Sequence, residues 1–237
     1  QPGESPMTSQ VVFENKGEPE LKGRFSTDNS GSEATGKRGV TLSVQAGDLL
    51  KANDVWSLSV RKSLGNKDKN SRSVSLDVKV PHGYNTYAAG YTDGGFKTLL
   101  TFPVTGTELS SEGANESAYV SASRVVFRDQ DSKHSTTLKL KRDSVESYIA
   151  DTKIDVSSRS LTSLLFSTES VLGFGQNVLI VSPEIAMGLD EADNLPEGVN
   201  TPVENPQSEY LRYKLTANWL QPFTLGDESL RWNSRFV

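Results

Sequence analysis

YLRYKLTANW, residues 210–219, alternates polar and apolar side chains without interruption. Successive side chains of a β-strand point to opposite faces, so each class of side chain gathers on its own face. The apolar face would carry Leu211, Tyr213, Leu215, Ala217 and Trp219. The stretch therefore predicts a strand with one apolar and one polar face.

The same period of two recurs in runs along most of the chain. Clear examples lie at 40–45, 56–61, 73–80 and 137–141. A helical period of 3.6 residues is not sustained anywhere, and only 183–193 suggests a short helix or a loop turn. The sequence therefore predicts an all-β fold.

Turn-forming residues between the runs predict ten connections. From the third connection onward, the odd-numbered ones tend to be longer than the even-numbered ones. This pattern is typical of an antiparallel up-and-down β-barrel, whose periplasmic turns are short. The sequence TDGG at 92–95 is also a fair hairpin signal, but we interpret it as a kink within one long strand, because the connections then alternate.

Composition excludes several classes of protein and site. Within the 237 residues no stretch approaches the roughly 20 apolar residues of a membrane helix. The chain has no cysteine, so disulfides and thiolate metal sites are excluded, and its two histidines, His82 and His134, lie far apart. A formal charge of −5 argues against nucleic-acid binding. No catalytic constellation stands out, so we expect no enzyme, no cofactor and no metal.

The charged residues on the polar faces of the predicted strands are mostly basic. They are Lys22, Arg24, Arg61, Lys79, Arg124, Lys139, Lys141, Arg212 and Lys214, with Asp77 the one acid. Many of the acids fall in the longer predicted loops, among them Glu108, Glu112, Glu116 and Glu146. A soluble β-sandwich alternates as a membrane barrel does, but it has no need to sort charges in this way. A barrel lumen with a cationic wall could serve as a conduit, so we predict that these basic residues line it.

Two stretches carry a family resemblance. In the first, NSG at 29–31 lies in a predicted loop, TGK at 35–37 leads into the next predicted strand, and DLL at 48–50 with Asp54 marks the next turn. In the second, SRVVFRDQDSK at 123–133 is followed by VSSRSL at 156–161. A weaker match, PFTL, lies at 222–225. These motifs resemble, in order, those of the outer-membrane transporters of two-partner secretion, which export haemolysins and filamentous haemagglutinins.

The resemblance implies a sixteen-stranded transmembrane barrel preceded by periplasmic POTRA domains, of which this chain would hold about ten or eleven strands. Residues 1–17 would end the last POTRA domain, and 18–237 would form the N-terminal part of the barrel. The family's Val-Arg-Gly motif is absent. The motif turn would comprise Arg128, Asp129, Gln130 and Lys133, with a structural role.

The implied function is export of a large adhesin or haemolysin partner across the outer membrane of a Gram-negative bacterium. The implied partners are that secreted protein and outer-membrane lipid or lipopolysaccharide. Two alternatives remain open at this point. One is a related barrel that inserts other barrel proteins, and the other is a soluble β-sandwich binding or adhesin module.

Overall fold

The structure is a computed structural model that describes residues 20–101, 106–189, 209–225 and 228–236. Its strands are β1 (Glu20–Asp28), β2 (Gly39–Gly47), β3 (Val55–Ser63), β4 (Asn70–His82), β5 (Asn85–Thr101), β6 (Glu108–Arg128), β7 (Ser132–Ile149), β8 (Thr152–Lys153), β9 (Arg159–Phe174), β10 (Asn177–Gly188), β11 (Leu211–Leu225) and β12 (Glu228–Phe236). The short 3-10 helix η1 covers Asp155–Ser157. No helix in the described part of the chain is long and apolar enough to cross a membrane.

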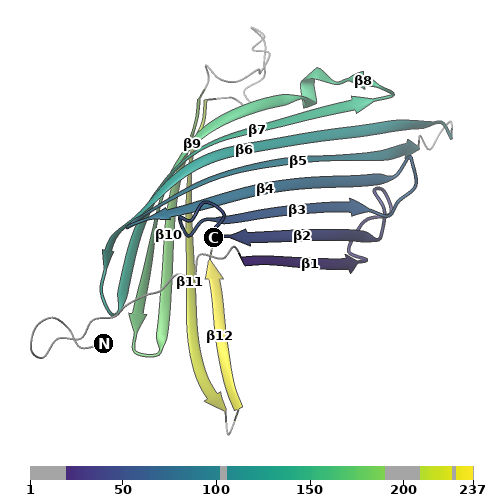
Figure 1. Ribbon diagram of the computed structural model, residues 1–237. Helices are drawn as coiled ribbons and strands as arrows, with labels where there is room; N and C mark the ends of the chain where they lie inside the picture. Colours follow the sequence, from purple (N-terminus) through teal and green to yellow (C-terminus); the bar gives the residue numbers. More distant parts are fainter. Residues whose placement is uncertain (1–19, 102–105, 190–208, 226–227, 237) are drawn as a thin grey trace, which may run out of the picture.

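All twelve strands belong to one antiparallel sheet. Eleven follow one another as neighbours in chain order, and the two-residue β8 folds back on β7. Figure 1 shows this sheet coiling, so that β10–β12 run at a steep angle to β1–β4. The sheet does not close, and β1 and β12 form its two edges. A soluble β-sandwich would need a second sheet packed on the first, so the sandwich alternative is wrong for the described residues.

Cross-strand register sorts the side chains into two faces, since directly opposed residues lie on the same face of a sheet. One ladder row runs through Leu21, Ala46, Trp56, Val78, Ala89, Val120, Leu140, Leu164, Met187 and Leu211. Large side chains of this face remain open to the surroundings; Leu21 is 73% exposed and Val120 56%. We call this the apolar face, and its exposure suits contact with lipid rather than a core.

The main expectations for the strands are confirmed. Each of the ten predicted connections contains the junction of two successive strands, although several of the residues predicted to form connections belong to the strands themselves, and β5 runs through Thr92–Gly95 without a turn. The suggested helix is wrong for 183–188, which belongs to β10; Ile185 and Met187 lie on the apolar face there. Residues 190–193 of that stretch, and the proposed POTRA segment 1–17, lie outside the described residues.

The connections after β5 and β7 are shorter than the sequence predicts. Glu108, Glu112 and Glu116 lie within β6, and Glu146 lies within β7, although loops were expected there. In this part of the hairpin both faces are polar, so the strand pairing continues without apolar alternation to reveal it. Strands β5, β6 and β7 have 17, 21 and 18 residues, against 9 in each of β1–β3.

Candidate functional site

The polar face brings most of the predicted basic residues together. Lys79, Lys139 and Arg212 lie in one ladder row, with Ala88, Ser121, Leu165 and Ala186 between them. Lys22 and Lys141 share the next row, while Arg24 and Arg61 lie on the same face nearer the other rim. Lys214 follows Arg212 along β11 by two residues, so it also lies on this face.

The prediction for Arg124 is wrong. Its neighbours across the ladder are Asn85 and Thr136, two residues along from the pair Ala122 and Leu138, so it lies on the apolar face. Tyr119 occupies the polar face of β6 instead, opposite Lys141. In β6 the aromatic Tyr119 lies on the polar face and Arg124 lies on the apolar face. Assigning faces by side-chain polarity therefore placed Arg124 on the wrong side.

The polar face carries more carboxylates than the sequence indicated. Lys22 pairs with Glu20 at 2.7 Å, Lys141 with Asp143 at 2.8 Å and Arg212 with Glu184 at 3.4 Å. Glu20 and Asp143 lie two residues from their partners on the same strand and face. Only the pair of Glu184 and Arg212 joins two strands and depends on register. The wall is therefore a mixed-charge surface that includes Lys79 and Lys214 as lysines for which the described residues supply no carboxylate within 4 Å.

Arg61 joins three strands near one rim. Its guanidinium donates to both carboxylate oxygens of Asp28, at 2.6 and 3.0 Å, and to the hydroxyl of Thr41 at 3.3 Å. The Arg61 guanidinium lies over Gly39, where an added Cβ would be 2.7 Å from Nη2. A bidentate pair fixes orientation as well as distance, so this contact ties β3 to β1 across β2.

A second cluster spans β4 to β7 at mid-height. The hydroxyl of Tyr119 donates to Asp77 Oδ1 at 2.7 Å, and Lys139 Nζ lies 4.9 Å from the centre of the Tyr119 ring. The ring lies across Gly90, where an added Cβ would be 2.3 Å from Cε1. The absence of a side chain at Gly90 therefore lets an acid, an aromatic ring and a lysine meet on the wall.

A hollow of about 360 Å³ lies on the polar face between β5 and β11. It is lined mainly by hydroxyls and charges: Thr86, Ser123, Ser135, Thr137, Ser167, Ser182, Thr216, Lys133, Lys214, Glu169 and Glu184. Arg124 and Thr168 also line the hollow, because their chain neighbours on either side face it. A hollow on this side indicates that the polar face is the concave side of the coiled sheet.

The turn after β2 is built around Asp54, which is 1% exposed. Its carboxylate accepts hydrogen bonds from Trp56 Nε1 at 2.6 Å and from the backbone N–H of Leu50 at 2.9 Å. Burial raises its pKa, but these hydrogen bonds outweigh that effect and hold the pKa below the ordinary value. The family-like sequence here, DLL with Asp54, thus has a local structural explanation.

The motif turn after β6 is capped by Asp129. Its Oδ1 accepts from the Ser132 backbone N–H at 2.6 Å, the Ser132 hydroxyl at 2.9 Å and the Asp131 N–H at 3.0 Å. Arg128 and Lys133 oppose each other across the ladder, with Asp129 and Gln130 beyond them in the turn. No ion pair joins Asp129 to Lys133 among the described residues.

Acidification is expected to loosen this turn. The hydroxyl of Ser132, with the two backbone N–H groups, lowers the pKa of Asp129. A lowered folded-state pKa gives stabilisation above the unfolded value of about 4, which is lost as the pH falls through the folded value. The amide resonance of Ser132 should therefore shift as the pH falls below about 4. Asp129→Asn should remove that shift, and an unchanged titration in the variant would contradict the assignment.

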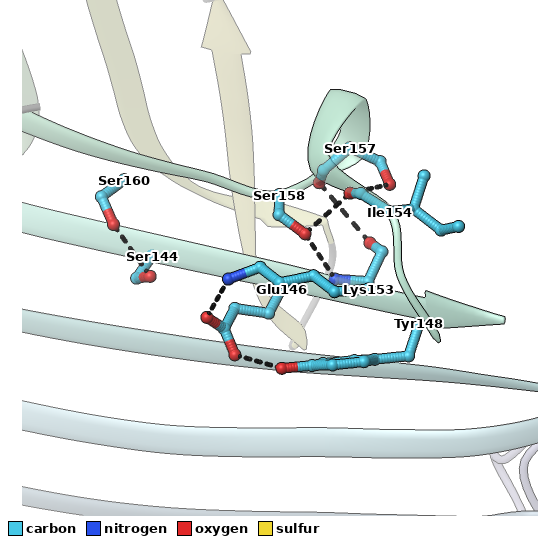
Figure 2. Close-up of polar contacts among 9 residues, drawn as sticks. Ser144, Glu146, Tyr148, Lys153, Ile154, Ser157, Ser158 and Ser160 are labelled. Atoms are coloured by element: carbon cyan, nitrogen blue, oxygen red, sulfur yellow. Dashed lines mark hydrogen bonds and ion pairs between the residues drawn. The ribbon is translucent and has the colours of Figure 1, made fainter. Parts of the chain in front are cut away.

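The opposite end of β7 carries a compact polar cap (Figure 2). Glu146 accepts from Lys153 Nζ at 2.7 Å and from the Tyr148 hydroxyl at 2.8 Å. Ser158 Oγ accepts from the Ser147 N–H at 3.1 Å and donates to the carbonyl of Ile154 at 2.9 Å. These bonds hold β8 and η1 against the end of the sheet, so the long connection is folded rather than open.

The sequence matches one protein family over residues 8–237, namely the haemolysin secretion/activation proteins ShlB/FhaC/HecB. The chain belongs to this haemolysin secretion/activation family. Relatives include the outer membrane transporter CdiB-2 of Burkholderia pseudomallei (28% identity over 99% of this chain and 40% of the relative) and the hemolysin transporter protein ShlB of Serratia marcescens (22%, 89% and 37%).

Two solved structures agree with the fold. CdiB from Escherichia coli superposes with a TM-score of 0.83 at 20% identity, covering 98% of this chain and 44% of that one. CdiB from Acinetobacter baumannii gives 0.66 at 21%, covering 92% and 38%. The chain thus spans about 40% of the length of the curated relatives it matches. It has the fold of an outer-membrane β-barrel whose sheet is incomplete, as predicted.

Proposed function

We propose that the protein is the outer-membrane pore of a two-partner secretion system, through which a large adhesin- or haemolysin-type partner leaves the cell. The observation that carries the proposal is the concave polar face, where basic, acidic and hydroxyl side chains form a continuous wall opposite an apolar outer surface. Family membership supports it, because the relatives are transporters by name. The protein would act by passage and not by catalysis.

The wall suits a passing unfolded chain because most of its groups make weak contacts. Hydroxyls in the hollow exchange hydrogen bonds with water or a peptide at little net gain, which is about 1 kcal/mol for a typical hydrogen bond. The charged rows add both signs, so segments of either charge find a partner without binding tightly. Lys79 and Lys214, for which the described residues supply no carboxylate within 4 Å, are members of the wall with which a passing acidic segment would pair.

The test uses the full-length chain, expressed in a Gram-negative host with the large secreted protein encoded beside it. We expect an outer-membrane band whose electrophoretic mobility changes on heating, together with export of the partner. Charge reversal by Lys79→Glu and Lys214→Glu should lower export, whereas Lys62→Glu on the apolar face, opposite Arg72, should leave it unchanged. A heat-modifiable barrel that leaves the partner in the periplasm would refute the transport proposal.

The alternative of a barrel-assembly protein has its own outcome in the same experiment. Loss of the full-length chain would then reduce the amount of unrelated barrel proteins in the outer membrane. The match to the secretion family over residues 8–237 favours export, so we expect the levels of those proteins to stay unchanged.

A further inference from the structure

Arg124 occupies an unusual position, since it is an exposed arginine on the face that meets lipid. Its side chain has no carboxylate within 4 Å among the described residues. A charged residue costs about 2–4 kcal/mol at the middle of a bilayer and about 0–1 kcal/mol near its edge. The position is therefore favourable only at the edge of the lipid band, where an anionic partner can reach the guanidinium.

The register places Arg124 at such an edge. Asn85, Arg124, Thr136 and Thr168 form one row across β5, β6, β7 and β9, all on the apolar face. The next row toward the middle of the sheet holds Tyr87, Ala122, Leu138 and Phe166. The boundary between lipid-facing apolar groups and hydrogen-bonding groups therefore runs between these two rows. We call the row of Asn85, Arg124, Thr136 and Thr168 the polar shelf.

Aromatic side chains flank the polar shelf on both sides. Tyr87 is 50% exposed in the row above, and Phe127, 52% exposed, lies below, with its ring 5.8 Å from that of His134. A bulge between Val125 and Phe127 brings Phe127 opposite His134 and keeps it on this face. Aromatic residues are enriched where a barrel surface passes from hydrocarbon to headgroups, which agrees with the change in polarity at the shelf.

The shelf lies toward the short turns at 83–84, 129–131 and 175–176, and away from the longer connections. In outer-membrane barrels the short turns face the periplasm. The lipids of the periplasmic leaflet are phospholipids, whose headgroups carry a phosphate. A guanidinium can donate two parallel hydrogen bonds to a phosphate, and the Asn85 amide and the Thr136 hydroxyl are further donors in the same row.

We propose that the polar shelf is a binding site for the headgroup phosphate of one phospholipid of the periplasmic leaflet, with Arg124 as its main ligand. The acyl chains of that lipid lie against the row of Tyr87, Ala122, Leu138 and Phe166. The site lies outside the barrel, so it does not depend on what passes through the pore. It would fix the depth of β5–β9 in the membrane.

Arg142 provides a matched control. It is also exposed, lies on the same face and has no carboxylate within 4 Å among the described residues. It is six residues from Thr136 along β7, so it lies about 20 Å from the shelf along the strand. Arg142 lies next to the polar row of Glu116 and Ser144, at the opposite edge of the apolar band and out of reach of a lipid held at Arg124.

The experiment measures lipid binding to the full-length protein, purified in a non-ionic detergent, by native mass spectrometry. Phosphatidylglycerol, diacylglycerol and inorganic phosphate are titrated separately. We expect phosphatidylglycerol to bind, and Arg124→Ala to weaken one binding event by at least about tenfold, since hydrogen bonds to a charged group are stronger than those between neutral groups. Arg142→Ala should leave that event unchanged. Arg124→Lys should recover part of the affinity, because it restores the charge without the two parallel donors.

Equal binding of phosphatidylglycerol by the wild type and by a heat-modifiable, correctly folded Arg124→Ala variant would overturn the proposal. Equal binding of diacylglycerol would also overturn it, since that lipid lacks the phosphate. Competition by inorganic phosphate at the same concentration as the lipid would show a simple anion site, and would likewise refute a phospholipid site.

Discussion

Val120→Arg is expected to prevent formation of the folded barrel in the outer membrane. Val120 is the middle of three apolar positions on β6 that face lipid, with Ala118 and Ala122 on either side. It lies opposite Ala89 and Leu140, so no acid on this face can accept the new charge directly. Arginine at the middle of the lipid-facing band costs about 2–4 kcal/mol, a large fraction of the stability of a typical folded protein.

The matched control is Ser117→Arg, three residues away on the polar face. Ser117 lies opposite Asp143, so an arginine there gains an acidic neighbour and remains in the concave, hydrated side of the sheet. We expect this variant to give the same heat-modifiable outer-membrane band as the wild type. Electrophoresis of heated and unheated membrane fractions distinguishes the two. A normally folded Val120→Arg variant would mean that this face does not meet lipid.

The sequence predicted those strands best in which one face is apolar and meets lipid. Wherever one side of a strand meets lipid, alternation marks the strand, and runs such as 73–80 and 210–219 gave β4 and β11 correctly. In 108–116 both faces of β6 are polar, so the sequence shows no alternation there although the strand pairs with β5 and β7. Backbone hydrogen bonding does not depend on side-chain polarity, which is why strands can continue where sequence periodicity ends.

The candidate site was predicted less completely than the fold, because it depends on register. The basic residues were found from alternation alone, and all but Arg124 lie on the expected face. Their partners were missed: Asp28 and Arg61 meet across β2, although 33 residues separate them in the sequence. Such pairs follow only from which residues oppose each other, and sequence periodicity does not fix that.

Gly90→Val is expected to destabilise the barrel even though valine favours strands more than glycine does. An added Cβ would lie 2.3 Å from Tyr119 Cε1 and 2.6 Å from Asp77 Oδ1. Either the ring must leave the wall, losing its 2.7 Å hydrogen bond to Asp77, or the strands must shift. Overpacking of this kind costs about 1–3 kcal/mol. Urea unfolding of the detergent-solubilised full-length protein should show the loss.

Gly23→Val separates this steric effect from strand propensity. An added Cβ at Gly23 on β1 would meet nothing within 4 Å, so only the propensity gain remains and the stability should stay equal or rise. Tyr119→Ala combined with Gly90→Val should restore part of the loss, since the double variant removes the ring that clashes. If Gly90→Val were as stable as Gly23→Val, the Tyr119 ring would not lie across Gly90. The contact between Asp77, Tyr119 and Lys139 would then not exist in the folded barrel.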